Sequence, residues 1–476
     1  MTSVMIRSLL LLAVSSKSLA APVEDKLVKR AISYGTFDNP FSASSLWNSV
    51  PIKPVLGSYR IPDTSTGWYP TIDDGDYSIG VFKTSASDPS QKILPIDSNG
   101  INDPDAEVSL PSVTLPHFPS NALSPNGTDG SVAIHDLTSG RIYSFWQLRQ
   151  DGSNWKAQQV SWGWQNGTGW GDPALYFQGA SASGSPNGAG LIRAAEYARR
   201  DDPMYYHALT MTLADNALAG KDGHGVYTWP ATSADSWGAQ SGQIREGDRL
   251  LLPSTFDVTK LRSKELRKVA RTLQKYGAYV VDRNDNTPFT IGVQLGLNYE
   301  IADKAMDWNN YVASGVPDDL NKVRRALAPM TSCDGYTTGD NKVIKPVVGR
   351  DVNLQSMRGP WTLVSGSTAG TFDTFGQRVV FPKGNTVMTG WGISDRVSWG
   401  PPKTGEKLRM TAYGSSGASI QLQVSTGSTK LVDTGALTNG KTKDFPWPSG
   451  ADLNPVWTIK SGSAANGWVS VDLRRV

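Results

Sequence analysis

Residues 188–237 combine the side-chain types that bind carboxylates and transfer protons. Arg193, Glu196, Tyr206 and His207 follow one another closely there, and two of the four histidines of the chain fall in this stretch. A guanidinium group binds a carboxylate through paired hydrogen bonds, and His, Tyr and Glu are common general acids and bases. The stretch therefore predicts an active site that handles sugar hydroxyls or carboxylates.

Two predicted elements position these groups. Leu191–Arg199 predicts a short helix, and Tyr205–Leu213 predicts a strand whose alternation puts His207 on an apolar face. Residues 201–203 reverse the chain between them, so the two segments are expected to lie around one cleft. A histidine on an apolar face is more often a hydrogen-bonded core residue, and that alternative stays open. In that case the next candidates are His135, Tyr143 and Asp282.

Glycoside hydrolysis is the first function that these residues predict, and it requires two carboxyl groups flanking the bond. Glu196 lies in the apolar context LIRAAEYA, where burial would raise its pKa and make it a proton donor. Asp136 and Asp282 are the candidates for the second carboxylate. The alternative for Glu196 is an ordinary salt bridge with Arg193 or Arg200.

Two further functions remain open. Elimination from a uronate-containing polysaccharide requires a cation for the carboxylate, a base and an acid, and Arg193, His207 and Tyr206 or Tyr227 match those roles. The third possibility is a non-catalytic protein that binds a cell wall or a polysaccharide. Such a protein would have no pair of ionisable side chains converging in a tryptophan-lined groove.

Sugar-binding residues are expected where tryptophans are concentrated. Five of the 16 tryptophans fall between positions 146 and 170, among Gly, Asn and Gln residues. Aromatic faces stack on pyranose rings while amides reach the hydroxyls, although such rings can also close a hydrophobic core. The predicted substrate-binding residues are Trp146, Trp162, Trp164, Trp170, Tyr227 and Trp229.

The sequence contains no GxSxG, HExxH, Walker or GxGxxG motif. Its four histidines are far apart, so no metal centre is predicted. Asp282-x-Asn284-x-Asn286 resembles the start of a calcium loop, but Thr287 stands where an EF-hand requires glycine. A looser structural calcium site near Asp282 stays open, and no other cofactor is expected.

The N-terminus predicts secretion. Arg7 precedes the apolar run Leu9–Val14, which indicates a signal peptide over residues 1–20, and residues 21–30 form a propeptide that ends in a dibasic pair. We therefore expect an extracellular protein. Asn126-Gly-Thr and Asn166-Gly-Thr are N-glycosylation acceptors, and Cys333 is the single cysteine, so no internal disulfide is expected.

The charge balance disfavours nucleic-acid binding. The chain has 46 Lys+Arg and 43 Asp+Glu, and the first 30 residues hold five of the basic and two of the acidic residues. The remainder therefore has no formal net charge, whereas nucleic-acid binding requires a clustered basic face. No stretch beyond the leader is apolar enough to cross a membrane. We expect a monomer whose partner is a polysaccharide.

Short alternating runs between Gly, Pro and Asp residues predict a mainly β fold. Residues 31–312 predict a catalytic β-sandwich or jelly-roll-like domain with one or two helices, of which residues 264–275 are the clearest. Residues 131–149 predict a hairpin. Residues 313–352, which are rich in Gly, Pro and Asp, predict a linker, and residues 353–476 predict a smaller accessory β-sandwich that resembles a carbohydrate-binding module.

In architecture and composition the chain is similar to secreted β-sandwich enzymes that degrade polysaccharides and carry an appended sugar-binding module. The similarity is carried by no motif, so it assigns no role to any residue. The sequence leads us to expect a secreted enzyme that cleaves an extracellular polysaccharide, by glycoside hydrolysis first and by elimination second.

Overall fold

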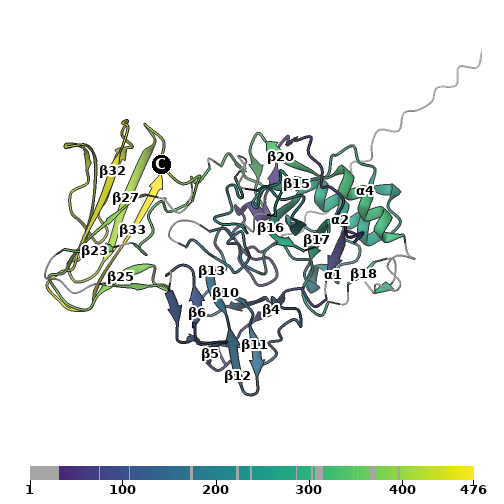
Figure 1. Cartoon of the computed structure of the whole chain (residues 1–476), viewed down its shortest axis with the longest axis horizontal. Helices are drawn as coiled ribbons and strands as arrows, with labels where there is room; N and C mark the ends of the chain where they lie inside the picture. The colour runs from purple at the N-terminus through teal and green to yellow at the C-terminus, as the bar shows by residue number, and fades with distance from the viewer. Residues whose placement is uncertain are drawn as a thin grey trace, which may run out of the picture. The chain divides into compact units, whose positions relative to one another are not determined.

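The computed structural model describes residues 32–476, apart from residues 74, 107, 172–174, 221–224, 236–238, 286, 298, 302–303, 306–314, 347, 351, 360, 365–369 and 394–396. The predicted signal peptide and propeptide therefore lie outside the described residues, as does His224. Residues 34–476 form one compact unit. About 36% of the chain is strand and 8% is helix, which confirms the predicted mainly β class (Figure 1).

A seven-stranded mixed sheet forms the framework of the first half. Its strands in spatial order are β2 (Val55–Leu56), β20 (Ala328–Ser332), β15 (Arg249–Leu251), β16 (Ala278–Asn284), β14 (Leu209–Ala214), β17 (Phe289–Gly292) and β3 (Thr71–Asp73). Successive side chains of a strand point to opposite faces. Ala278 and Val280 therefore enter one core, whereas Tyr279 and Val281 enter another.

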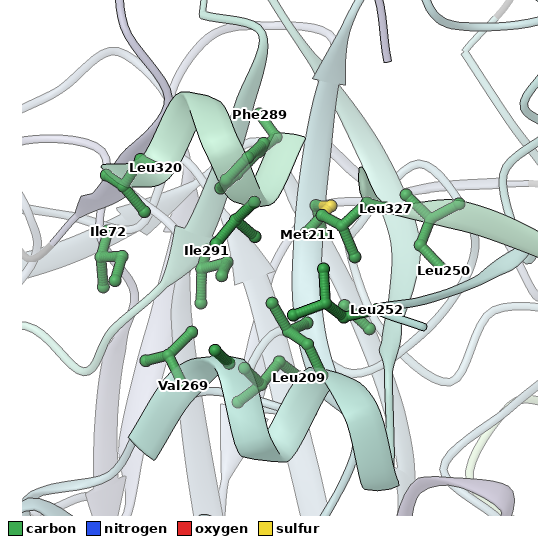
Figure 2. Packing of buried hydrophobic residues seen from close by; sticks show 14 of the residues in the cluster. Ile72, Leu209, Met211, Leu250, Leu252, Val269, Phe289, Ile291, Leu320 and Leu327 are labelled. Carbon is green, nitrogen blue, oxygen red and sulfur yellow. The ribbon is translucent and has the colours of Figure 1, made fainter. Parts of the chain in front are cut away.

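Two helices cover the first of these faces. Val269 and Leu273 of α2 (Lys264–Lys275) pack with Leu209 and Met211 of β14, together with apolar residues of α4 (Val316–Ala326) (Figure 2). The predicted helix at 264–275 is confirmed, and the Ser263 side chain caps it by accepting a hydrogen bond from Leu266 N at 3.0 Å.

Part of the predicted linker belongs to this core. Pro317 and two aspartates of the 313–352 segment stand in the first turn of α4, where proline and acidic side chains are favourable. Leu320 and Val323 are buried in the helix, and β20 pairs with β15. Residues 316–332 are therefore built into the sheet and its core, whereas the outer domain boundaries stay predictions.

A six-stranded sheet faces a second and a third core. Its strands are β4 (Gly80–Lys83), β9 (Val132–Asp136), β10 (Arg141–Trp146), β13 (Gln159–Trp164), β6 (Ile101–Asp103) and β7 (Val108–Leu110). The pairing of β9 with β10 confirms the predicted hairpin. Ile134 points into a core shared with a four-stranded sheet, whereas Ala133 points into the core that contains Tyr279. His135 points to the same face as Ala133.

The remaining sheets and short helices complete this part of the chain. The four-stranded sheet contains β11 (Arg149–Asp151), β12 (Asn154–Ala157), β5 (Gln91–Pro95) and β8 (Val113–Leu115). Two smaller sheets contain β1 (Val50–Pro51), β21 (Tyr336–Thr337) and β22 (Val343–Ile344), and β18 (Glu300–Ile301) and β19 (Lys304–Ala305). The short helices are η1 (Leu46–Asn48), α1 (Ala194–Tyr197) and η2 (Val258–Lys260).

The C-terminal part is a β-sandwich with its own core, as predicted. One sheet contains β23 (Trp361–Leu363), β26 (Val387–Trp391), β32 (Asn454–Lys460), β28 (Ser419–Thr426) and β29 (Thr429–Asp433), with β30 (Leu437–Thr438) beside β28. The other contains β24 (Thr371–Asp373), β25 (Arg378–Phe381), β33 (Gly467–Arg475), β27 (Lys407–Gly414) and β31 (Thr442–Pro446). Leu408 and Trp457 of the two sheets share one core. Among the described residues, no helix has the length and apolar character that crossing a bilayer requires.

Candidate functional site

Arg193 and Glu196 are fixed by the single turn of α1. The predicted helix at 191–199 is shorter than expected, because the chain before it pairs with the end of β17 and the residues just after it. Ile192 N donates to Gly292 O, and Ala194 N donates to Gln294 Oε1 at 3.1 Å. Glu196 folds back and accepts a hydrogen bond from Arg193 N at 3.3 Å. Both side chains are buried, with 3% of Arg193 and 4% of Glu196 exposed.

His207 lies before β14 and not within it, which corrects the predicted strand. Ala208 N donates to Trp47 O, so the chain enters the sheet only at Leu209. His207 Nε2 lies 3.1 Å from Glu196 Oε2, and Nδ1 lies 2.8 Å from Ala208 O. Because both partners accept, both ring nitrogens carry a proton, and the ring is held as an imidazolium.

The pair of His207 and Glu196 is an ion pair. Burial lowers the pKa of His207, but the charge and hydrogen bond of Glu196 outweigh burial and hold it above its ordinary value. Burial raises the pKa of Glu196, but the charge and hydrogen bond of His207 hold it below its ordinary value. The expectation that burial raises the pKa of Glu196 overall is therefore wrong.

Arg193 retains hydrogen-bonding capacity inside the protein. Its Nη2 donates to Phe37 O at 3.3 Å, and its Cζ lies 4.6 Å from the centre of the Phe37 ring. Its Nε and Nη1 are buried and have no partner among the described residues. Burial lowers the pKa of Arg193 to about 10, so the group stays cationic at neutral pH.

His135 is a buried neutral histidine with one free nitrogen. Gln165 Nε2 donates to Thr36 O at 2.6 Å, which turns Gln165 Oε1 toward His135 Nδ1 at 2.7 Å. Nδ1 therefore carries the proton, and the Nε2 lone pair has no partner within the described part of the chain. Burial and the charge of Arg193 lower the pKa of His135 to about 3.

Phe37 and Gly188 connect these groups. The Phe37 ring lies edge-on to His135, with ring centres 5.1 Å apart, and also contacts Arg193. A methyl group at Gly188 would lie 3.5 Å from His135 Nε2, so Gly188 leaves space in front of that nitrogen. Gly188 and Arg193 both line one pocket. Its other lining residues are Asp38, Asn39, Pro40, Phe41, Trp47, Asn48, Gly190, Leu191, Glu196, Tyr206 and His207.

The predicted residues Arg193, Glu196, Tyr206 and His207 thus share a pocket, whereas Asp136 and Asp282 lie elsewhere. Asp136 accepts hydrogen bonds from Thr138 and Ser139 in the β9–β10 turn and from Thr84 after β4, and His117 Nδ1 lies 3.3 Å from it. This is a structural turn carboxylate. Its contacts with the described residues include none to a residue that contacts Glu196.

Asp282 belongs to a separate group of acids, in which Glu246 is buried and Asp282 and Asp235 are half-buried. Its carboxylate accepts hydrogen bonds from Ala182 N and Arg283 N, and burial together with the charge of Asp235 raises its pKa well above the ordinary value. Burial and the charge of Asp282 likewise raise the pKa of Glu246. Among the described residues, no group of His, Cys, Asp or Glu side chains is arranged to hold a metal ion.

Most of the predicted aromatic residues lie in cores or contact other elements. Trp162 and Trp170 are 2% and 3% exposed, and Trp170 stacks on Trp47 at 4.9 Å. Trp146 Nε1 lies 3.5 Å from Asp129, the Tyr227 hydroxyl accepts from Ser398 N, and Trp229 is partly buried. Trp164 alone of the predicted six is strongly exposed, at 44%, and it lies outside the Arg193 pocket.

From the sequence, His135 was only a secondary candidate, and no role was predicted for Phe37, Gln165 or Gly188. His135 follows a run of small and apolar residues, which predicts a core strand. The only feature of the sequence that pointed to a role for His135 in the site was its position beside a predicted hairpin turn. Gln165, which is 30 positions away, determines which nitrogen of His135 carries the proton and which is free. A contact between such distant residues leaves no periodic pattern in the sequence.

Comparison with protein-family models and with curated proteins finds no match. Among solved structures, TmCBM61 in complex with β-1,4-galactotriose is similar over 26% of this chain and 99% of its own, at 14% identity and a TM-score of 0.19. The glycosylation-associated protein complex Gap123 from Streptococcus agalactiae is similar over 24% of this chain, at 13% identity and a TM-score of 0.18, and the match spans 44% of that chain. These partial similarities are too weak to bear on the chemistry of this pocket.

Proposed function

We propose that the protein is a secreted enzyme that cleaves a uronate-containing extracellular polysaccharide by β-elimination in the Arg193 pocket. The observation that carries this proposal is the juxtaposition of two buried groups, both in contact with Phe37. One is the Arg193 guanidinium with two unpartnered N–H groups, and the other is the neutral His135 ring with an unpartnered lone pair.

Arg193 fits the carboxylate of an acidic sugar. Leaving a buried donor without an acceptor costs about 1–3 kcal/mol, and that cost is recovered when a ligand supplies the acceptor. A carboxylate oxygen can accept from Nε or from Nη1, which lie on different sides of the guanidinium, whereas a neutral hydroxyl cannot match the charge. Glu196 is already neutralised by His207, and Asp38 is exposed to solvent, so neither acid satisfies these donors.

His135 fits the base of the elimination. Its Nε2 takes the proton on the sugar carbon next to the carboxylate, and the electron pair of that C–H bond forms a carbon–carbon double bond. The bond from the neighbouring carbon to the glycosidic oxygen breaks, and that oxygen leaves with a proton from an acid. Tyr206 lines the pocket and is our candidate for this acid. No water, metal or oxidant enters this balance.

Burial, and after it the positive charge of Arg193 beside the ring, lower the pKa of His135 to about 3. A bound carboxylate adds one negative charge, which offsets the positive charge of Arg193 and so raises the pKa of His135. The base thus gains proton affinity when an anionic substrate is in place. Gln165 keeps Nε2 as the accepting nitrogen throughout.

Glycoside hydrolysis has less support from this geometry. The reaction needs one protonated carboxyl and a second carboxyl across the bond. Glu196 is held ionised by His207, and Asp136 and Asp282 contact neither Glu196 nor each other among the described interactions.

Incubation with polyuronates and with neutral glucans and mannans tests the proposal. Each reaction is followed by ultraviolet absorbance of the unsaturated product and by an assay for reducing ends. We expect both signals with at least one polyuronate and neither with the neutral polymers. Arg193→Lys, which keeps the charge but loses the Nε and Nη1 donors, is expected to lower kcat/KM mainly through KM.

Other outcomes would contradict the proposal in distinguishable ways. Reducing ends without ultraviolet absorbance would indicate hydrolysis. Polymer binding that depends on Arg193 but yields neither signal would indicate a non-catalytic binding protein. Cleavage of neutral polymers only would remove the role assigned to Arg193.

A further inference from the structure

A second hollow lies at the turn that follows β13, and its lining shares no residue with the Arg193 pocket. It is lined by Gly35, Leu137, Gly140, Trp164, Gln165 and Asn166. None of these side chains is ionisable, so the hollow can bind a neutral group but offers no general acid or base. Trp164 is 44% exposed, and Asn166 is exposed beside it.

The Trp164 ring is held in a fixed position. It packs edge-on against Trp162, with ring centres 5.1 Å apart at 88°, and the guanidinium of Arg141 lies 5.4 Å from its centre. Arg141 is also the residue opposite Trp164 in the β10–β13 pairing. A rigid, exposed indole beside neutral amides suits a sugar, because the apolar face of a sugar ring can stack on the face of an aromatic ring. The indole is already held in place, so it loses little conformational freedom when a sugar binds.

The turn brings Asn166 to the same hollow. Gly167 N donates to Trp164 O at 3.0 Å, and Ser42 N donates to Gly167 O at 2.9 Å, which fixes the reversal of the chain. Asn166-Gly167-Thr168 is an N-glycosylation acceptor. The amide nitrogen that would carry a glycan therefore lies on the rim of a hollow with an indole ring in its lining.

We propose that Asn166 carries an N-linked glycan and that its first N-acetylglucosamine packs on Trp164. The proposal rests on the secretion proposed above but not on the chemistry of the Arg193 pocket. A sugar attached two residues from the ring has an effective concentration on the order of millimolar or higher, and it therefore competes well with a free polysaccharide chain. Trp164 then serves stability and not substrate binding.

The experiment uses the protein secreted by a eukaryotic host. Glycopeptide mass spectrometry is expected to find both Asn126 and Asn166 modified. An endoglycosidase that leaves one N-acetylglucosamine should leave Tm unchanged, whereas an amidase that removes the whole glycan should lower it by about 1–3 °C. Asn166→Gln should lower Tm to the same extent, since it removes the glycan without creating an aspartate.

Two matched variants isolate the proposed contact between the first N-acetylglucosamine and Trp164. In Trp164→Ala, the two glycosidase treatments should have the same effect on Tm, because the first sugar no longer has a ring to pack on. Asn126→Gln is the control for glycan loss alone, since Ser124 and not an aromatic residue stands two positions before it. Its Tm should match that of the wild type.

Several results would overturn the inference. Modification of Asn126 with Asn166 unmodified would remove the packing, and so would absence of glycans at both positions. Equal Tm losses in Asn126→Gln and Asn166→Gln would show that the ring adds nothing. Loss of polysaccharide binding in fully glycosylated Trp164→Ala would assign the ring to the substrate instead.

Discussion

The two histidines near Arg193 differ in what their nitrogens contact. His207 has protein acceptors at both nitrogens, Glu196 Oε2 and Ala208 O, whereas His135 has one hydrogen-bond partner among the described residues, Gln165. A ring with both nitrogens engaged can hold a charge in place but cannot take another proton. The free lone pair is therefore on His135, although the sequence favoured His207 as the catalyst.

The ion pair of His207 and Glu196 predicts how the stability of the protein depends on pH. The folded chain holds the His207 proton more tightly than the unfolded chain, whose pKa is near the ordinary 6.5. The stability contributed by the raised pKa is therefore fully present below pH 6.5 and is lost as the pH rises through the folded value. The lowered pKa of Glu196 has the opposite pH dependence. The stability that it contributes is present above about pH 4.5 and is lost as the pH falls through the folded pKa.

Comparison of the wild type with His207→Gln measures this contribution. Between pH 5 and 6.5 the wild type should exceed the variant in unfolding free energy by about 1.4 kcal/mol for each unit by which the His207 pKa is raised. The difference should shrink above pH 6.5. Denaturant unfolding at several pH values provides the measurement, and a difference that stays constant from pH 5 to 8 would contradict the ion pair.

At the scale of elements, α2 depends on a local signal that a mutation can test. Ser263 Oγ accepts from Leu266 N, and its removal leaves that buried donor without a partner. Ser263→Ala should destabilise the protein by about 1 kcal/mol, whereas Ser263→Thr, which keeps an acceptor, should cost less. Chemical denaturation of the two variants measures this, and equal costs would argue against the cap.

Local patterns predicted the elements that local contacts define. The apolar spacing and the cap of α2, and the hairpin of β9 and β10, could be found from adjacent residues. The strand predicted from Tyr205 failed before Leu209 because Trp47 O and Thr272 Oγ1 take the backbone donors of Ala208 and Tyr205. Those acceptors come from distant parts of the sequence.

The candidate site was only partly predictable for the same reason. Arg193, Glu196 and His207 are close in sequence, and their shared pocket follows from the chain reversal that the sequence predicted. The contribution of His135 requires Phe37 and Gln165, which approach only when the six-stranded and seven-stranded sheets enclose a common core. Residue types indicate the chemistry, but the tertiary fold selects which histidine is free.

On the scale of the whole molecule, separate cores coexist with polar contacts between the predicted domains. The C-terminal core contains only residues from 352 onward. However, Thr374 Oγ1 donates to Asp103 Oδ2 at 2.7 Å, Arg358 donates to Pro104 O, and Trp399 Nε1 donates to Ala231 O. These contacts contribute to stability, and Phe375 of the C-terminal part also packs against the core that contains Tyr143 and Trp162, with ring centres 6.1 Å and 6.2 Å away.

Truncation after Gly349 tests that division. We expect residues 31–349 to remain folded and soluble, because α4, β20 and the apolar core are retained, with a lower Tm because Asp103 and Ala231 O lose their partners. Circular dichroism melting of both forms measures the difference. An insoluble truncated form, with one cooperative transition in the full chain, would contradict the boundary.

The access of substrate to His135 Nε2 is the central claim, and Gly188→Ala tests it most directly. The added methyl group would lie 3.5 Å from both Nε2 and Ala133 Cβ, an ordinary packing distance that covers the lone pair without strain.

The measurement is kcat for formation of the unsaturated product from the best polyuronate, with Tm determined in parallel. His117→Gln serves as the control, because His117 contacts Asp136 outside the pocket. We predict a fall in kcat of about 10²–10⁴-fold in Gly188→Ala, with Tm unchanged and His117→Gln near the wild type. Wild-type turnover in Gly188→Ala would contradict the role of His135.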